Sequence, residues 1–237
     1  MIGVCIPAHN EEQYIDACLA SVLNAANHPA LHGEPVHVVV VLDACSDATA
    51  WRSRYWPVTS LHVNFKNVGL ARAAGARYLI DLGVRWLAFT DADSRVSQAW
   101  LMHQLSFNAD VVCGTVEVTD WSAHGAFAKQ AQQVFQAGYL DQENHKHVHG
   151  ANLGVHPEAY LRVGGFDALA CSEDQALVDK LVLVGATIAW TALPRVATSA
   201  RPISRVEGGF ATALRQAWKT KTLEAIAQAP VELKPDH

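Results

Sequence analysis

Three features are scarce or missing in this 237-residue sequence, and each absence narrows the class of protein. The five cysteines are scattered and include no Cys-x-x-Cys pair, which favours reduced thiols in a cytosolic enzyme over a secreted protein. No apolar run approaches the roughly 20 residues of a membrane span, so we expect no spanning helix. The apolar start is broken at Pro7 and followed by Asn10-Glu11-Glu12 without a basic leader, so a first strand is expected there rather than a signal peptide.

A block of charge of one sign is the third missing feature. Eighteen Lys and Arg residues stand against 23 Asp and Glu residues, which gives a net charge of −5. A nucleic-acid-binding protein would show a basic patch, so nucleic acid is not expected as a partner. Apolar residues, in contrast, are abundant: 50% of the chain is hydrophobic, which is enough for the core of a sizeable α/β domain.

The first part of the chain alternates predicted strands with predicted helices. Apolar and β-branched runs predict strands at 3–7, 36–42, 58–65 and 85–90, and Asn10 is predicted to cap the first helix. Short connections imply right-handed crossovers and a doubly wound parallel sheet, in which ligands bind beyond the carboxyl ends of the strands. Polar residues follow each of these strands and are expected around one crevice: residues 8–12, Asp43, residues 67–72 and residues 91–93.

Regular alternation is lost after Asp93. Ser172 is predicted to cap a helix in a capping box with Gln175. We expect one domain over residues 1–237, made of a first half at 1–95, a second half at 96–208, and a C-terminal helix and tail at 209–237. The other elements expected after Asp93 are helices at 97–107, 121–140, 157–163 and 208–227, strands at 109–119, 145–155 and 187–193, and a polar loop at 197–207.

Two pairs of acids stand out in the chain. Asp91 and Asp93 follow a predicted buried strand, and because residues i and i+2 of an extended segment face the same side, they can converge on one ligand. Such a pair suits a divalent cation that is also held by phosphate oxygens, although the triplet taken alone favours an Asp-rich turn followed by a helix N-cap. Glu173 and Asp174 begin a predicted helix, where acids are also favoured by the helix dipole alone.

A series of motifs in this sequence resembles family 2 glycosyltransferases of the GT-A fold, over roughly residues 2–210. The resemblance implies an α/β fold with a mostly parallel, doubly wound sheet and a C-terminal helical or loop extension. It also implies an inverting, hexosyltransferase-type enzyme that uses Mn²⁺ or Mg²⁺. The motifs are VCIPAHNEE at 4–12, SDAT at 46–49 after Asp43, NVGLARAAG at 67–75, TDAD at 90–93, GAN at 150–152, GGF at 164–166 and SED at 172–174.

Carried over by position, the resemblance implies a site for a UDP- or GDP-linked sugar. Asp93 would bind the metal, Asp174 would be the catalytic base, and Glu173 would be the alternative base or its partner. Ala8 and Ala73 depart from the family pattern, which leaves the nucleotide base open. The implied nucleotide-sugar site consists of Pro7, Ala8 and Glu11 at base and ribose, Asp43 at the base, Arg72 at nucleotide or diphosphate, Asp91 at the ribose, and Ala92 and Asp93 beside it. On the acceptor or diphosphate side the implied residues are His149, Gly150, Asn152, Arg201 and Arg205.

Other interpretations stay open at this point. A sugar nucleotidyltransferase would need a glycine-rich, basic loop after the first strand, which residues 7–12 do not supply. A non-catalytic nucleotide-sugar-binding module is a further alternative, against which the two intact acid pairs argue. His145, His147 and His149 alternate, so on a strand they would share a face and could bind metal or flank an acceptor pocket.

Aromatic and apolar side chains in the second half have two explanations each. Four aromatics either line an acceptor pocket or pack in the core: Trp121, Phe127, Phe135 and Tyr139. The last helix carries an apolar stripe that we expect to pack on the domain or on a second subunit, which would make a homodimer. That stripe consists of Phe210, Leu214, Trp218 and Leu223. The acceptor cannot be identified from these residues.

Overall fold

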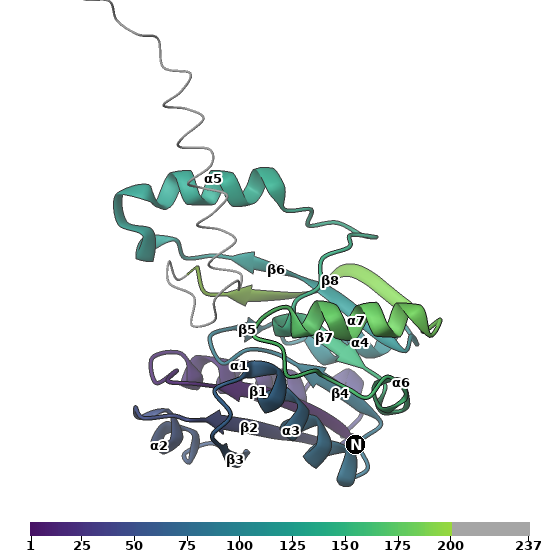
Figure 1. The fold of residues 1–237 in the computed structure, drawn as a ribbon. Coiled ribbons are helices and arrows are strands. Elements are labelled where there is room, and N and C mark those ends of the chain that lie inside the picture. Colours follow the sequence, from purple (N-terminus) through teal and green to yellow (C-terminus); the bar gives the residue numbers. More distant parts are fainter. Residues whose placement is uncertain (201–237) are drawn as a thin grey trace, which may run out of the picture. The chain divides into compact units, whose positions relative to one another are not determined.

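The structure is a computed structural model that describes residues 1–200, and its central feature is an eight-stranded sheet (Figure 1). The order of strands is β3-β2-β1-β4-β7-β6-β8-β5. The elements are β1 (Ile2–Ala8), α1 (Ile15–Ala26), η1 (Pro29–Leu31), β2 (Val36–Asp43), α2 (Thr49–Ser53), β3 (Thr59–Val63), α3 (Val68–Asp81), β4 (Trp86–Phe89), β5 (Arg95–Val96), α4 (Trp100–Ser106), β6 (Val111–Val118), η2 (Ser122–Phe127), α5 (Ala128–Gly138), η3 (Gly150–Asn152), β7 (Leu153–Val155), α6 (Pro157–Arg162), α7 (Glu173–Leu183) and β8 (Ile188–Thr198).

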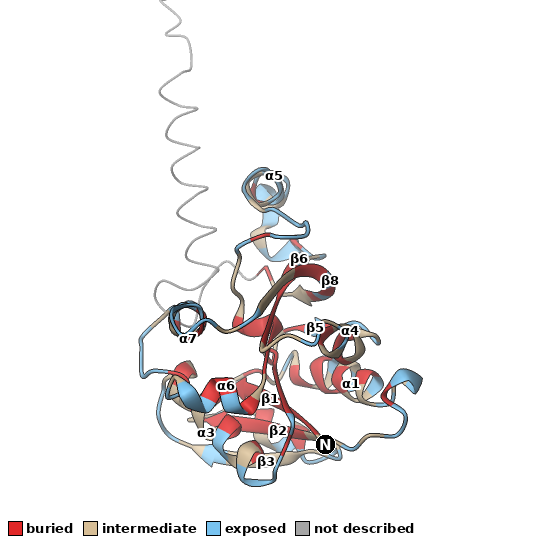
Figure 2. Cartoon of the chain, turned by 90° about the vertical axis from the view of Figure 1, so that its right-hand side faces the viewer, coloured by how far each residue is buried: buried red, intermediate tan, exposed pale blue. Residues whose placement is uncertain are grey.

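The first four strands form the parallel part of the sheet. β1 pairs in parallel with β2 and β4, and β2 pairs in parallel with β3. Every residue of β1 and β4 is buried, because helices cover both faces of these strands (Figure 2). The predicted doubly wound parallel arrangement of this part is therefore confirmed.

Alternation along β1 sends side chains into two separate cores. Val4 and Ile6 pack with α1 and α4, whereas Cys5 packs with α3 and α7. Figure 2 shows these helices on opposite sides of the sheet, with α1 and α4 on one side and α3, α6 and α7 on the other. This layering places the carboxyl ends of β1, β2 and β4 at one edge, where the polar loops lie.

The remaining strands make the sheet mixed. β7 is antiparallel to both β4 and β6, while β6 runs parallel to β8, and β8 is antiparallel to the short β5. β8 extends to Thr198, beyond the predicted end at 193, because Val196 and Ala197 pair with β5. The loss of regular alternation after Asp93 is thus a change from parallel to mixed pairing within the same sheet.

Two predicted helix caps do not form, although α7 begins at Glu173 as expected. α1 begins at Ile15, and Asn10 has a positive φ of 55° and uses its side-chain oxygen to accept from the backbone of Ser46 and Asp47 instead of capping the helix. Ser172 also has a positive φ, 59°, and makes no side-chain cap, so the capping box with Gln175 does not form. Asn10 therefore joins its own loop to the loop after β2.

Two predicted long elements are interrupted. The helix predicted at 121–140 is divided into η2 and α5, because Gly125 adopts a non-helical conformation with φ 55°. The strand predicted at 145–155 is regular only over β7; before it, side-chain acceptors take the backbone N–H groups of His147 and Gly150, which a sheet neighbour would otherwise receive.

By their internal contacts the residues divide into two compact units. One contains residues 1–119 and 140–199, and the other contains residues 120–139 among the described part of the chain. The one-domain layout expected from the sequence stays a prediction. None of the helices between residues 1 and 200 has both the length and the apolar character that crossing a bilayer requires. Arg201, Arg205 and the helix predicted at 208–227 lie outside the described residues.

Candidate functional site

Two loops at the carboxyl ends of β1 and β2 hold each other in place. The side-chain oxygen of Asn10 accepts the N–H of Ser46 at 2.8 Å, and Asp47 accepts the N–H of Glu12 at 3.1 Å. In return, Glu12 accepts the N–H of Ala48 at 2.9 Å. These reciprocal bonds fix both loops before any ligand arrives.

The residues predicted to line the nucleotide lie along this pair of loops. Pro7 and Ala8 are buried at the end of β1, and Ala8 accepts a hydrogen bond from the Cys45 thiol at 3.2 Å. Glu11 is buried, and its backbone N–H donates to the Thr49 hydroxyl at 2.7 Å. The structure brings these predicted residues together at one edge of the sheet.

Asp43, at the end of β2, organises the turn into α3. Its carboxylate accepts the backbone N–H groups of Phe65, Lys66 and Asn67 at 2.7, 2.9 and 2.9 Å. Asn67 in turn caps α3 by accepting the N–H of Leu70 at 2.9 Å. The predicted contact of Asp43 with a nucleotide base stays a prediction; in the structure the carboxylate already supports the next loop.

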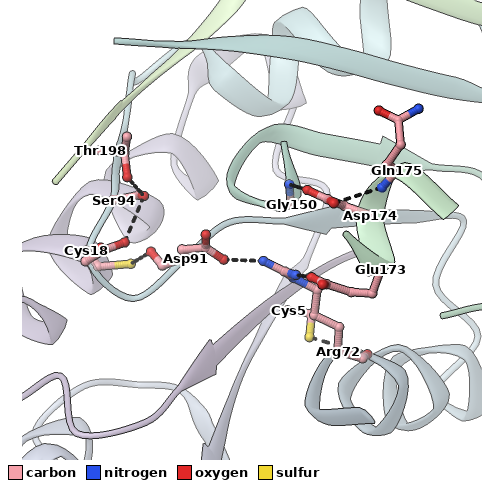
Figure 3. Close-up of polar contacts among 11 residues, drawn as sticks. Cys5, Cys18, Arg72, Asp91, Ser94, Gly150, Glu173, Asp174, Gln175 and Thr198 are labelled. Carbon is pink, nitrogen blue, oxygen red and sulfur yellow. Dashed lines mark hydrogen bonds and ion pairs between the residues drawn. The ribbon is translucent and has the colours of Figure 1, made fainter. Parts of the chain in front are cut away.

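The Asp91-Asp93 pair at the end of β4 is divided between two environments. Asp91 accepts a hydrogen bond from the guanidinium of Arg72 at 2.5 Å (Figure 3). Asp93 accepts a longer bond of 3.3 Å from Ser94, whose hydroxyl also lies 3.0 Å from that of Thr198 on β8. Ser94 is fully buried and had no sequence signal, because its partner on β8 lies 104 residues away.

Arg72 on α3 is the buried cation of this site. It is 3% exposed and pairs with Asp91 on one side and with Glu173 on the other. Burial lowers the pKa of Arg72, but the carboxylates of Asp91, Glu173 and Asp174 outweigh this effect and raise its pKa above the ordinary value. The guanidinium therefore stays charged and holds the two acid pairs to one centre (Figure 3).

Glu173 and Asp174, at the start of α7, differ in exposure. Glu173 is buried at 5% exposure against Arg72; burial raises its pKa, Arg72 lowers it in part, and Asp174 and Asp91 add to the rise. Asp174 is half-buried and accepts the backbone N–H of Gly150 at 2.7 Å and that of Gln175 at 2.8 Å. Asp174 is thus the more accessible of the two predicted bases.

The donor set at this edge suits a metal that is shared with a substrate. Within residues 1–200 no three His, Cys, Asp or Glu side chains are grouped closely enough to hold a metal by themselves. Three carboxylates nevertheless face the single guanidinium of Arg72, which leaves an excess of negative charge. Mg²⁺ and similar hard cations are often bound by one or two carboxylates plus phosphate oxygens, so the residues present fit such an ion.

Asn152, predicted on the acceptor side, belongs to the core instead. It is fully buried, and its side-chain oxygen accepts from the Trp100 indole at 2.9 Å. Its amide nitrogen donates to the carbonyl oxygens of Thr115 and Pro194. Asn152 therefore ties η3 to α4, β6 and β8, while its predicted place on the acceptor side stays a prediction.

The three alternating histidines stack on one another before η3. Ring centroids are 5.6 Å apart for His145 and His147, and 6.0 Å apart for His147 and His149. His145 is buried, with one ring nitrogen accepting the N–H of His147 and the other 3.2 Å from the Thr191 carbonyl. Burial, together with His147 and His145, lowers the pKa of His149 to about 3, so this ring is neutral at physiological pH.

The predicted aromatic wall is a set of stacked rings in the second compact unit. Ring centroids are 5.7 Å apart for Trp121 and Phe135, and 4.7 Å apart for Phe135 and Tyr139. Phe127 is exposed. The structure thus brings three of these four aromatics together, while their role toward an acceptor stays a prediction.

Comparison with solved structures identifies the fold. S. aureus TarS 1-349 in complex with UDP-GlcNAc matches with a TM-score of 0.61 and 16% identity, over 98% of this chain and 68% of that chain. The mannosyltransferase PcManGT from Pyrobaculum calidifontis, in complex with GDP-Man and Mn²⁺, matches with a TM-score of 0.64 and 17% identity, over 99% of this chain and 65% of that chain. GalNAc-T7 with UDP, GalNAc and Mn²⁺ matches with a TM-score of 0.62 and 15% identity, over 88% of this chain and 44% of that chain.

These likenesses confirm the predicted GT-A fold. The chain spans between 37% and 68% of the length of the TarS chains that it matches. A comparison of the sequence with curated proteins gives no match. The family model of Glycosyl transferase family 2, however, matches residues 3–162 of the 237, which is more than half of the chain. The chain therefore belongs to glycosyl transferase family 2.

Proposed function

We propose that this protein is a metal-dependent, inverting glycosyltransferase that moves a sugar from a nucleoside-diphosphate sugar to an acceptor hydroxyl. The observation that carries the proposal is the arrangement of the two acid pairs about Arg72, with Asp91-Asp93 at the end of β4 and Glu173-Asp174 at the start of α7. Family membership supports the same chemistry. A non-catalytic binding module transfers no proton, so it would not need the base that the Glu173-Asp174 pair provides.

The proposed reaction is a single displacement. The acceptor oxygen attacks the anomeric carbon from the side opposite the diphosphate, the bond from that carbon to the diphosphate oxygen breaks, and the configuration inverts. Asp174 takes the proton of the acceptor hydroxyl as the new bond forms. Its two backbone hydrogen bonds, from Gly150 and Gln175, fix the direction of the carboxylate, as a base requires.

The leaving nucleoside diphosphate needs its growing negative charge neutralised. A divalent metal supplies Lewis-acid neutralisation of this kind when it is bound. Asp93 would hold the ion, with Ser94 supporting the carboxylate. Mn²⁺ is the ion in the solved structures of PcManGT and GalNAc-T7, and Mn²⁺ or Mg²⁺ is proposed here.

The donor is proposed to be a UDP- or GDP-linked sugar. UDP-GlcNAc and GDP-Man accompany the structures of TarS and PcManGT, which supports both nucleotides equally. The ordered loops after β1 and β2, with Pro7, Ala8, Glu11 and Asp43, are the proposed surface for the nucleoside. All five cysteines of the chain are free, with Cys5, Cys18 and Cys113 buried, which supports a cytosolic location.

Calorimetric titration tests this function. Wild-type protein is titrated with UDP-GlcNAc and with GDP-Man, each in Mn²⁺ and in a chelator, alongside Asp93→Ala and the control Asp81→Ala, whose carboxylate pairs with exposed Arg77 on α3. We expect one donor to bind in Mn²⁺ with an affinity that Asp93→Ala weakens by about ten-fold or more. Equal affinity with and without Mn²⁺ would remove the metal assignment, and binding without any release of nucleotide in the presence of acceptors would favour the non-catalytic module.

A further inference from the structure

Arg72 connects the two acid pairs through one side chain. Its guanidinium donates through Nη2 to Asp91 Oδ1 at 2.5 Å and through Nη1 to Glu173 Oε1 (Figure 3). The three residues come from α3, from the end of β4 and from the start of α7. A shift of the guanidinium therefore affects both Asp91, on the proposed donor side, and Glu173 at the start of α7.

The Arg72 side chain also packs against the backbone that holds Asp174. A Cβ atom on Gly150 would overlap the guanidinium of Arg72, so the two groups are in direct contact. The N–H of the same glycine donates to Asp174 Oδ2 at 2.7 Å. Asp174 is thus supported twice from Arg72, through its chain neighbour Glu173 and through Gly150.

The first turn of α3 holds the segment that leads into α7. Asn67 donates through its side chain to the Leu169 carbonyl at 2.8 Å, while its backbone N–H donates to Asp43 at 2.9 Å. A Cβ atom on Gly69 would overlap the Asp167 carbonyl, so this helix turn and the 164–172 segment are tightly packed. The first turn of α3 therefore fixes both the loop on the nucleotide side, through Asp43, and the segment that leads into α7.

Glu173 is unsuited to act as the base itself. Its carboxylate is buried and bonded to the guanidinium, so it would have to leave a buried ion pair before it could meet an acceptor. Breaking such a pair leaves an uncompensated buried charge, which is strongly unfavourable. Asp174 is half-buried, and its support comes from neutral backbone groups.

We propose that Arg72 and Glu173 form a positioning unit that fixes Asp174 and couples its placement to the donor side of the crevice through Asp91. This inference rests on the proposed function for the identity of the base. Neither Arg72 nor Glu173 takes the proton in this scheme. Glu173 keeps the start of α7 in place, and Arg72 keeps both Glu173 and Gly150 in place.

The test combines hydrogen exchange with kinetics in the full-length protein. The variants are Glu173→Gln, which keeps the shape but removes the charge, Arg72→Lys, and the control Arg77→Lys on the exposed face of α3. Exchange of the peptide that covers residues 148–152 is followed by mass spectrometry without any ligand. We expect exchange there to be about ten-fold faster in Glu173→Gln and in Arg72→Lys, and unchanged in Arg77→Lys.

Kinetics distinguish positioning from proton transfer. Nucleotide release from UDP-GlcNAc and from GDP-Man is measured in Mn²⁺ across pH. In Glu173→Gln we expect turnover to fall about ten- to hundred-fold with the donor KM nearly unchanged, while the loss of rate at acid pH that marks a base persists. Asp174→Asn should remove that acid-side loss of rate.

Two results would overturn the positioning unit. One is unchanged exchange at 148–152 in both Glu173→Gln and Arg72→Lys; the other is disappearance of the acid-side loss of rate in Glu173→Gln, which would make Glu173 the base. Failure of the proposed function has a different signature: wild-type protein would neither bind nor cleave a nucleotide sugar, while the exchange measurement would still decide whether the unit exists. If Arg72→Lys fails to fold, the nearly isosteric Glu173→Gln carries the test alone.

Discussion

The two acid pairs of this site are alike in one respect and different in another. In each pair the first carboxylate, Asp91 or Glu173, is bound to Arg72. The second carboxylate is held differently: Asp93 accepts from the Ser94 hydroxyl, whereas Asp174 accepts from two backbone N–H groups. In the proposed function the first acid of each pair provides structure, whereas Asp93 binds the metal and Asp174 takes the proton.

In the proposed function Asp93 and Asp174 have different roles, and their hydrogen-bond partners fit this difference. Two backbone N–H groups fix the direction of the Asp174 carboxylate, which suits a base that must meet an acceptor hydroxyl. In the proposed function Asp93, whose carboxylate accepts from the Ser94 hydroxyl at 3.3 Å, is a ligand of a divalent cation that a diphosphate also binds. A variant that alters one member of a pair should therefore have an effect that depends on its place in the pair.

The largest effect is expected from Asp174→Asn. The amide keeps the size of the side chain but cannot take a proton, so kcat should fall by about 10²- to 10⁴-fold while donor affinity is retained. Single-turnover kinetics with the donor that binds in calorimetry provide the measurement. Asp179→Asn is the matched control, because Asp179 lies exposed on the same helix and pairs with Gln175. Equal losses in both variants would contradict the division of work between the two acids.

A smaller effect, on the free energy of unfolding, is expected from Gly150→Ala, because this substitution disturbs the contacts of Arg72 with both acid pairs. The added methyl would meet the Arg72 guanidinium, which must then move away from Asp91 and Glu173. Overpacking of this kind costs about 1–3 kcal/mol, so the free energy of unfolding in urea should fall by that amount. Gly138→Ala is the control, because a Cβ atom there meets nothing within 4 Å. Unchanged stability in Gly150→Ala would mean that Arg72 is held loosely.

The sequence predicted the parallel half of the fold well for a physical reason. β2 and β4 are nearly continuous apolar runs that lead into Asp43 and Asp91, so both the strand and its polar edge are local features. The predicted nucleotide-side residues consequently lie together. The short crossover connections between these strands also leave few alternative topologies for this half of the sheet.

What could not be predicted depends on distant partners. The ion pair of Arg72 with Glu173 joins residues 101 positions apart, and the bond from Trp100 to Asn152 joins residues 52 apart. No local pattern marks Asn152 as a core residue, and the same Gly-Ala-Asn motif fits a ligand site equally well. Asn10 was likewise predicted as a helix cap, although its partners lie on the next loop.

The smallest effect is expected from Glu34→Gln, which removes the exposed ion pair of Glu34 with Arg85. This pair is compared with the buried pair of Arg72 and Glu173. Hydrogen bonds from Arg85 lower the pKa of Glu34 from the ordinary 4.5 to about 2. A lowered carboxylate pKa contributes stability above pH 4.5 that disappears as the pH falls toward 2. Because the Arg85 side chain is 55% exposed, solvent screening limits that contribution to about 1 kcal/mol or less. Urea unfolding of Glu34→Gln should therefore approach wild type as the pH falls toward 2 and show a small loss at pH 7, and a loss as large as that of Gly150→Ala would show that burial is not what sets the Arg72 network apart.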